Sequence, residues 1–166
     1  MSIFTTRFSC GMVKRKGVRA VRISAKCSIA VHCLLFLHEY GRTQKITSGL
    51  LALSTGCNPV MIRSIMSAMK KAGIIQVTAG SGGAVLVLPP EEITLYRVYT
   101  AVEGDGLRDL IGVHSMPSAL CPIGRSIRAV LQKPYAVVQE DMRKSLQSVT
   151  LADFIAEYRK TGSGPV

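Results

Sequence analysis

Tryptophan is absent from this chain of 166 residues, aromatic residues make up only 5% of it, and 21 lysines and arginines outnumber 10 acidic residues. Long apolar runs are also missing. The longest lies around residues 29–37, is interrupted by His32, and is much shorter than the roughly 20 residues that cross a bilayer. The first 20 residues contain no apolar block of signal-peptide length. These absences predict a cytoplasmic protein without a membrane partner.

Cysteines are too scattered for a disulfide framework or a zinc motif, because their number, five, is odd and no C-x-x-C pair occurs among them. Catalytic combinations are also scarce. The best one pairs Cys121 as nucleophile with His114 as base, and it has no evident orienting carboxylate beyond Asp105 or Asp109. We therefore expect that the chain is not an enzyme.

The net charge of +11 is concentrated towards the N-terminus. Residues 1–21 hold five basic and no acidic residues, residues 22–92 hold seven and three, and residues 93–166 hold nine and seven. Such an excess of positive charge indicates a polyanionic partner. Residues 1–21 show no periodicity and are interpreted either as a flexible basic arm or as a segment foreign to the natural protein.

Two helices are predicted before residue 56. The first begins at Ser24, a favourable N-cap, runs to about Glu39 and is ended by Gly41. Its apolar residues spread over more than one face, which is typical of a central, buried helix. Thr47 is predicted to cap a short second helix, which Gly56 ends.

A third helix over residues 58–72 is the most informative segment. Asn58 is predicted as its N-cap, Pro59 as its first helical residue and Gly73 as its terminator. One face carries polar and basic residues, and the other carries apolar residues at 3–4 spacing: Ile62, Ile65, Met66 and Met69. A short helix, a glycine-containing turn and a second amphipathic helix predict a helix-turn-helix.

Two β-type runs follow at residues 74–78 and 84–88, and the glycine-rich residues 80–83 separate them. This pattern predicts a β-hairpin, the wing of a winged helix. The predicted turn lacks the arginine or lysine that wings often place in the minor groove. It either approaches the DNA backbone through its amides or is a plain structural hairpin.

The remaining sequence predicts a helix from about Leu95 to Val102, a loop up to Leu120, and a long helix that ends near Ser148. Pro134 lies inside the long helix and predicts a kink or a break there. Thr150 is predicted to cap a last short helix, and residues 161–166 are predicted to form a flexible tail. The predicted fold class is mostly α with a small β-hairpin, with a winged helix-turn-helix domain over residues 22–92.

The third helix favours double-stranded DNA as the polyanionic partner, because an α-helix fits the major groove, where base edges can be read. Arg63 is suited to a guanine edge, and Asn58 to a base or a phosphate. The N–H groups at the helix start favour a phosphate oxygen, as do Lys70 and Lys71. The alternative for this stretch alone is a surface helix with a solvated basic face.

Six segments, in this order along the chain, resemble the bacterial Rrf2 type of winged-helix transcription regulators. They are Arg22-Ile23-Ser24, CNPVMIRSIMSAMKKAGII, GSGGAVLVLPPEEIT, Ala101-Val102-Glu103-Gly104, Cys121-Pro122-Ile123-Gly124 and Thr150-Leu151-Ala152-Asp153. The resemblance covers about residues 22–158 and implies a homodimeric repressor on a nearly palindromic operator. It also implies that residues 93–160 supply a linker, an effector loop and a dimerisation helix. By position, it places these residues at the DNA: Asn58, Pro59, Val60, Arg63, Ser64 and Ser67.

Cluster-binding members of that family place three cysteines in the loop before the long helix. Between Gly104 and Arg125 this chain has only Cys121. An iron–sulfur cluster needs about four ligands, mostly thiolates, which Cys121 and His114 cannot supply within one chain. We therefore expect no cluster and no metal, and a small-molecule effector of unknown identity.

Cys121 and His114 are nevertheless candidate sensor residues. Cys121 directly precedes Pro122 at the predicted start of the long helix, where the helix dipole, Arg125 and Arg128 favour a thiolate open to oxidation. The alternative is an inert capping cysteine and a solvated histidine. For the whole chain, the alternative function is a winged-helix module for protein–protein assembly without specific DNA binding.

Overall fold

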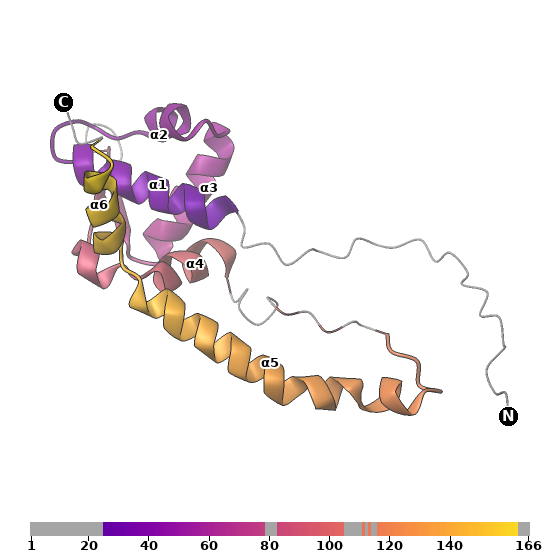
Figure 1. The fold of residues 1–166 in the computed structure, drawn as a ribbon. Coiled ribbons are helices and arrows are strands. Elements are labelled where there is room, and N and C mark those ends of the chain that lie inside the picture. The colour runs from indigo at the N-terminus through magenta and orange to yellow at the C-terminus, as the bar shows by residue number, and fades with distance from the viewer. Residues whose placement is uncertain (1–24, 79–82, 105–110, 112, 114–115, 163–166) are drawn as a thin grey trace, which may run out of the picture.

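A computed structural model describes residues 25–78, 83–104, 111, 113 and 116–162. The helices are α1 (Ala25–Tyr40), α2 (Ser48–Thr55), α3 (Pro59–Lys71), the short 3-10 helix η1 (Pro90–Glu92), α4 (Leu95–Glu103), α5 (Pro122–Ser148) and α6 (Leu151–Lys160); the strands are β1 (Ile75–Thr78) and β2 (Gly83–Leu86). The fold is mostly helical with one small hairpin, as predicted. Figure 1 shows α1 running through the middle of the body and α5 extending away from it.

Helix α1 is the centre of the hydrophobic core, which confirms the prediction of a buried first helix. It packs against α2, α3, α4, α6 and β2. Its buried side chains are Cys27, Ala30, Cys33, Leu34 and Leu37. The predicted cap Ser24 lies outside the described residues. The helix ends one residue before Gly41, whose N–H donates to the Leu37 carbonyl at 2.9 Å.

Helices α2 and α3 form the predicted helix-turn-helix, and both predicted caps are confirmed. The Thr47 hydroxyl accepts a hydrogen bond from the Leu50 N–H at 3.2 Å, and Asn58 Oδ1 accepts one from the Val60 N–H at 2.8 Å. Gly56 ends α2 with a φ of 65°, in the left-handed region that favours glycine. The chain therefore turns sharply between the two helices.

Strands β1 and β2 pair antiparallel as the predicted wing, with Ile75 opposite Leu86. The wing is fastened to the segment before α2, because the Ala84 N–H donates to the Ile46 carbonyl at 3.1 Å. Only glycine fits next to this contact: Gly83 has a φ of +72°, and a Cβ there would come within 3.0 Å of the Ile46 nitrogen. The wing tip, residues 79–82, lies outside the described residues.

The C-terminal part returns to the same core. The Leu95 N–H donates to the Val149 carbonyl at 2.7 Å, and the Leu151 N–H donates to the Ile93 carbonyl at 2.8 Å. The predicted cap of α6 is confirmed as a capping box between Thr150 and Asp153. Because the core includes residues on both sides of residue 92, the predicted division into residues 22–92 and 93–160 stays a prediction.

Helix α5 runs without interruption through Pro134, so of the two predicted outcomes, a kink or a break, the structure excludes the break. Figure 1 shows its axis changing direction along its length, in keeping with a bend. The helix continues because no residue of α5 is buried, so water can reach the carbonyl that Pro134 leaves without a partner. Among the described helices, none is long and apolar enough to cross a membrane.

Candidate nucleic-acid interface

Helix α3 exposes its polar face and buries its apolar one. The apolar face is buried through Ile62, Ile65, Met66 and Met69, the four residues predicted from the spacing. All seven residues that the sequence places at DNA are exposed: Asn58, Pro59, Val60, Arg63, Ser64, Ser67 and Lys70. Their contact with DNA stays a prediction, but the orientation that such contact requires is present.

Three of the seven predicted residues, Arg63, Ser67 and Lys70, line a groove of about 500 Å³ between α3, the N-terminus of α2 and the wing. We call it the α3 groove. Its other lining residues are Lys45, Ile46, Thr47, Ser48, Met66, Val77, Thr78 and Gly83. The eleven lining residues thus include three cations and no carboxylate. This charge pattern suits the negatively charged backbone of a nucleic acid.

The other predicted residues lie outside the α3 groove, at and near the exposed start of α3. Asn58 uses its side-chain oxygen to cap the helix, so only its amide N–H groups remain to donate to a base or a phosphate. Val60 is 63% exposed, which is unusual for valine. Such an apolar side chain beside polar ones suits a thymine methyl group in the major groove.

The sequence reasoning missed the far wall of the groove. Lys45, Thr47 and Ser48 lie where the chain enters α2, opposite Arg63 and Lys70. Thr47 was predicted only as a helix cap. A lysine two residues before that cap was the signal available, because a cation beside free helix N–H groups is suited to bind phosphate.

Arg97 of α4 was also missed, and it positions α3. Its Nη2 donates to the Ala72 carbonyl at 3.2 Å, at the C-terminal end of α3. A cation at this end of a helix compensates the dipole and satisfies a carbonyl that has no partner within the helix. The two residues are 25 positions apart, and no sequence pattern links them.

The candidate sensor residues are only partly described. Cys121 is exposed and is the N-cap of α5, and its side chain accepts no capping hydrogen bond from the helix. His114 lies outside the described residues. Two other thiols are protected: burial raises the pKa of Cys27 to about 11 and that of Cys33 to about 12. Both therefore stay protonated and unreactive at neutral pH.

Known proteins are similar to this chain in both sequence and fold. The model of the family described as Rrf2, iron-dependent transcriptional regulator, matches residues 23–157. YwnA of Bacillus subtilis, a candidate HTH-type transcriptional regulator, is 34% identical over 131 residues, which span 79% of this chain and 95% of YwnA. A crystal structure of a candidate transcriptional regulator from Lactobacillus plantarum is 30% identical, covers 81% of this chain and 90% of its own, and has a TM-score of 0.68.

A more distant structure, that of T. potens IscR, shares the fold with a TM-score of 0.63 at 18% identity, over 87% of this chain and 93% of its own. The family model covers most of the chain. The chain therefore belongs to the Rrf2 family of transcriptional regulators.

Proposed function

We propose that this protein is a cytoplasmic repressor that binds a nearly palindromic DNA operator as a homodimer and has no catalytic activity. The observation that supports it best is the α3 groove. There an exposed polar helix face lies beside three cations, Lys45, Arg63 and Lys70. A helix held in this way can enter the major groove while the flanking lysines contact phosphates.

The exposed face of α5 supports a second copy of this chain as partner. Ile123, Val130 and Val137 are 70%, 60% and 61% exposed. They lie seven residues apart, so they share one side of the helix and repeat as the seam positions of a coiled coil do. Pairing of two α5 helices would cover these side chains and present two α3 helices to one duplex.

We propose further that the protein works without an iron–sulfur cluster. Within the described residues, no three histidine, cysteine, aspartate or glutamate side chains are grouped so that they could hold a metal ion. Cys27 and Cys33 lie on the buried face of α1, whereas a cluster needs accessible thiolates. Iron and sulfide analysis of protein purified without oxygen should find less than about one tenth of an iron per chain.

The decisive experiment has two steps. Selection from genomic fragments with the purified protein identifies an operator, and fluorescence anisotropy then measures its affinity at several salt concentrations. We expect steep salt dependence, and a log–log slope that Lys45→Ala and Lys70→Ala each reduce by about 1.8, because each change removes one phosphate contact from each of the two chains of the dimer. Arg63→Ala should instead reduce discrimination between the operator and a variant with one substituted guanine.

Lys160→Ala on α6 is the matched control, because this exposed lysine lies outside the α3 groove. It should leave the slope unchanged. If no fragment is enriched, or if Arg63→Ala and Lys70→Ala leave nucleic-acid binding untouched, the winged helix is an assembly module and the proposed function is wrong.

A further inference from the structure

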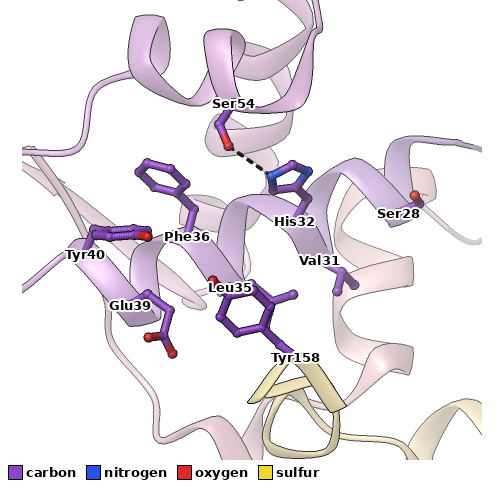
Figure 2. A pocket seen from close by; sticks show the side chains of 9 residues that line it. All are labelled: Ser28, Val31, His32, Leu35, Phe36, Glu39, Tyr40, Ser54 and Tyr158. Carbon is purple, nitrogen blue, oxygen red and sulfur yellow. Dashed lines mark hydrogen bonds between the residues drawn. The ribbon is translucent and has the colours of Figure 1, made fainter. Parts of the chain in front are cut away.

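A second cavity of about 480 Å³ opens between α1, the end of α2 and α6, and we call it the α1 pocket (Figure 2). Its volume lies in the range of small-molecule sites. Val31, Leu35 and Phe36 form apolar walls. Figure 2 shows Phe36 beside Tyr40, and the two ring centroids are 4.8 Å apart. Tyr158 approaches them from α6, so the pocket brings three aromatic rings together.

The charge of the α1 pocket is opposite to that of the α3 groove. Among its nine lining residues there is one carboxylate, Glu39, and no lysine or arginine. This occurs on a chain whose net charge is +11. A cavity with aromatic walls and one carboxylate favours a cation over an anion or a neutral molecule.

One oxygen of Glu39 lacks a hydrogen-bond donor. Its side chain is only 11% exposed, and its Oε1 is buried without a hydrogen-bond partner. The Nε2 of His38 lies 3.8 Å from this oxygen, which is beyond hydrogen-bond distance. A largely buried carboxylate with one unpaired oxygen is costly for the protein, and a cation bound beside this side chain would offset part of that cost.

The neighbouring hydroxyls cannot take the place of a cation. Desolvation, and then the nearby Tyr40 and Glu39, raise the pKa of Tyr158. Its hydroxyl therefore stays neutral at neutral pH. At the other end of the pocket, His32 Nε2 is hydrogen-bonded to the Ser54 hydroxyl at 3.0 Å.

We propose that the α1 pocket binds an arylalkylammonium ion, that is, a primary amine with an aromatic body, as the effector of this protein. The ammonium group donates to Glu39 and faces the aromatic rings, while the body of the ligand packs on Val31 and Leu35. The nine lining residues supply each of these contacts, and none of them belongs to the α3 groove.

Helix α2 connects this pocket to the α3 groove. Ser54, near its C-terminal end, lines the α1 pocket, whereas Thr47 and Ser48, at its N-terminal end, line the α3 groove. The helix has only eight residues, so it moves as one rod. A ligand that displaces Ser54 or its partner His32 therefore shifts Thr47 and Ser48 relative to α3. This regulatory step rests on the proposed function, whereas binding of the amine does not.

Binding is tested by isothermal titration calorimetry with benzylamine, 2-phenylethylamine and tryptamine, and with 2-phenylethanol as the neutral counterpart. We expect at least one amine to bind with a Kd below about 1 mM, and 2-phenylethanol to bind at least about tenfold more weakly. Glu39→Gln should weaken amine binding by at least about tenfold, and Glu157→Gln, an exposed carboxylate on α6, should not.

Circular dichroism verifies that each variant is folded, and Tyr40→Leu, which removes one aromatic ring, replaces Glu39→Gln if that variant unfolds. Equal binding to wild type and to the folded pocket variant, or no binding by any of the three amines, overturns the proposal.

Regulation is tested by DNA titration with and without the amine that binds. By linkage, the amine should change operator affinity by at least about fivefold in the wild type and not in Glu39→Gln. An unchanged affinity leaves the amine site but overturns its role as an effector site. Should the protein bind no operator at all, the proposed function fails, and calorimetry still decides whether the α1 pocket binds amines.

Discussion

Helices α3 and α5 are both amphipathic, but the apolar face of α3 is buried within the chain, whereas that of α5 is exposed. Four apolar residues of α3 are buried in the core of the same chain. No residue of α5 is buried, and Val130 and Val137 are mostly exposed. Only the inner end of α5 reaches the core, where Met142 and Leu146 pack as partly buried residues.

This difference separates the two tasks that a dimeric DNA-binding protein has to perform. A helix that reads bases needs a fixed position within its own domain, which the core gives to α3. A helix that joins two copies must leave its apolar face uncovered in the single chain, as α5 does. The stability of α3 should therefore depend on one chain, and that of the outer part of α5 on protein concentration.

The largest expected effect comes from Ile62→Ala on the buried face of α3. The fully buried isoleucine leaves a cavity, and we expect the free energy of unfolding to fall by about 2–5 kcal/mol. Urea denaturation at several protein concentrations measures it, and the loss should not depend on concentration. Val130→Ala is the contrasting variant, because its loss should shrink as the protein is diluted below the dimer dissociation constant. If both losses respond alike to dilution, the apolar faces of α3 and α5 are not covered in different ways.

The next largest effect is expected for the double change Val130→Glu and Val137→Glu. Two carboxylates on the exposed face should prevent pairing, so the protein becomes a folded monomer whose thermal unfolding midpoint equals that of the wild type diluted below its dimer dissociation constant. Losing one of two joined α3 helices should weaken operator binding by at least about 100-fold. Light scattering and fluorescence anisotropy measure the two effects.

Gln132→Glu is the matched control for that variant, since it adds a charge on the far side of α5. It should leave both the mass and the affinity unchanged. A double variant that remains dimeric would show that α5 is not the seam.

The sequence predicted the local features of this molecule well. Helix caps predicted the roles of Thr47 and Asn58, and the conformational freedom of glycine predicted the turn at Gly56. The 3–4 spacing of apolar residues predicted the buried face of α3. All of these signals act within a few residues. The sequence left open whether α5 is kinked or broken at Pro134, because that outcome depends on whether the carbonyl freed by the proline meets water.

Contacts between distant segments were also missed. The far wall of the α3 groove brings Lys45 opposite Lys70, and the anchor at the end of α3 joins Arg97 to Ala72. These pairs depend on how α4 and the segment before α2 pack on α3. The periodicity of a sequence does not show which segments pack against one another. The α1 pocket was missed for the same reason, since Tyr158 comes from α6 and Glu39 from α1.

A smaller effect is expected for Arg97→Ala, which removes the anchor of α3 without touching its DNA-facing residues. The loss of a charge-assisted hydrogen bond to the Ala72 carbonyl should lower the free energy of unfolding by about 1–2 kcal/mol. If Arg97 positions α3, operator affinity should also fall at temperatures where the variant is fully folded. Arg97→Lys retains the charge and should recover part of both effects. An affinity that stays at the wild-type value would limit Arg97 to stability alone.

The smallest effect is expected at Asn58, where a cap and a predicted DNA contact share one side chain. Asn58→Ala removes both and should cost about 1 kcal/mol of stability. Asn58→Ser keeps an oxygen that can cap α3 but removes the amide N–H groups, so stability should stay within about 0.5 kcal/mol of wild type while operator affinity falls about threefold to tenfold. Thermal unfolding and anisotropy on the two variants separate these roles. A serine variant with wild-type affinity would mean that Asn58 acts only as the cap, and that Arg63 and the lysines of the α3 groove make the contacts at this end of the helix.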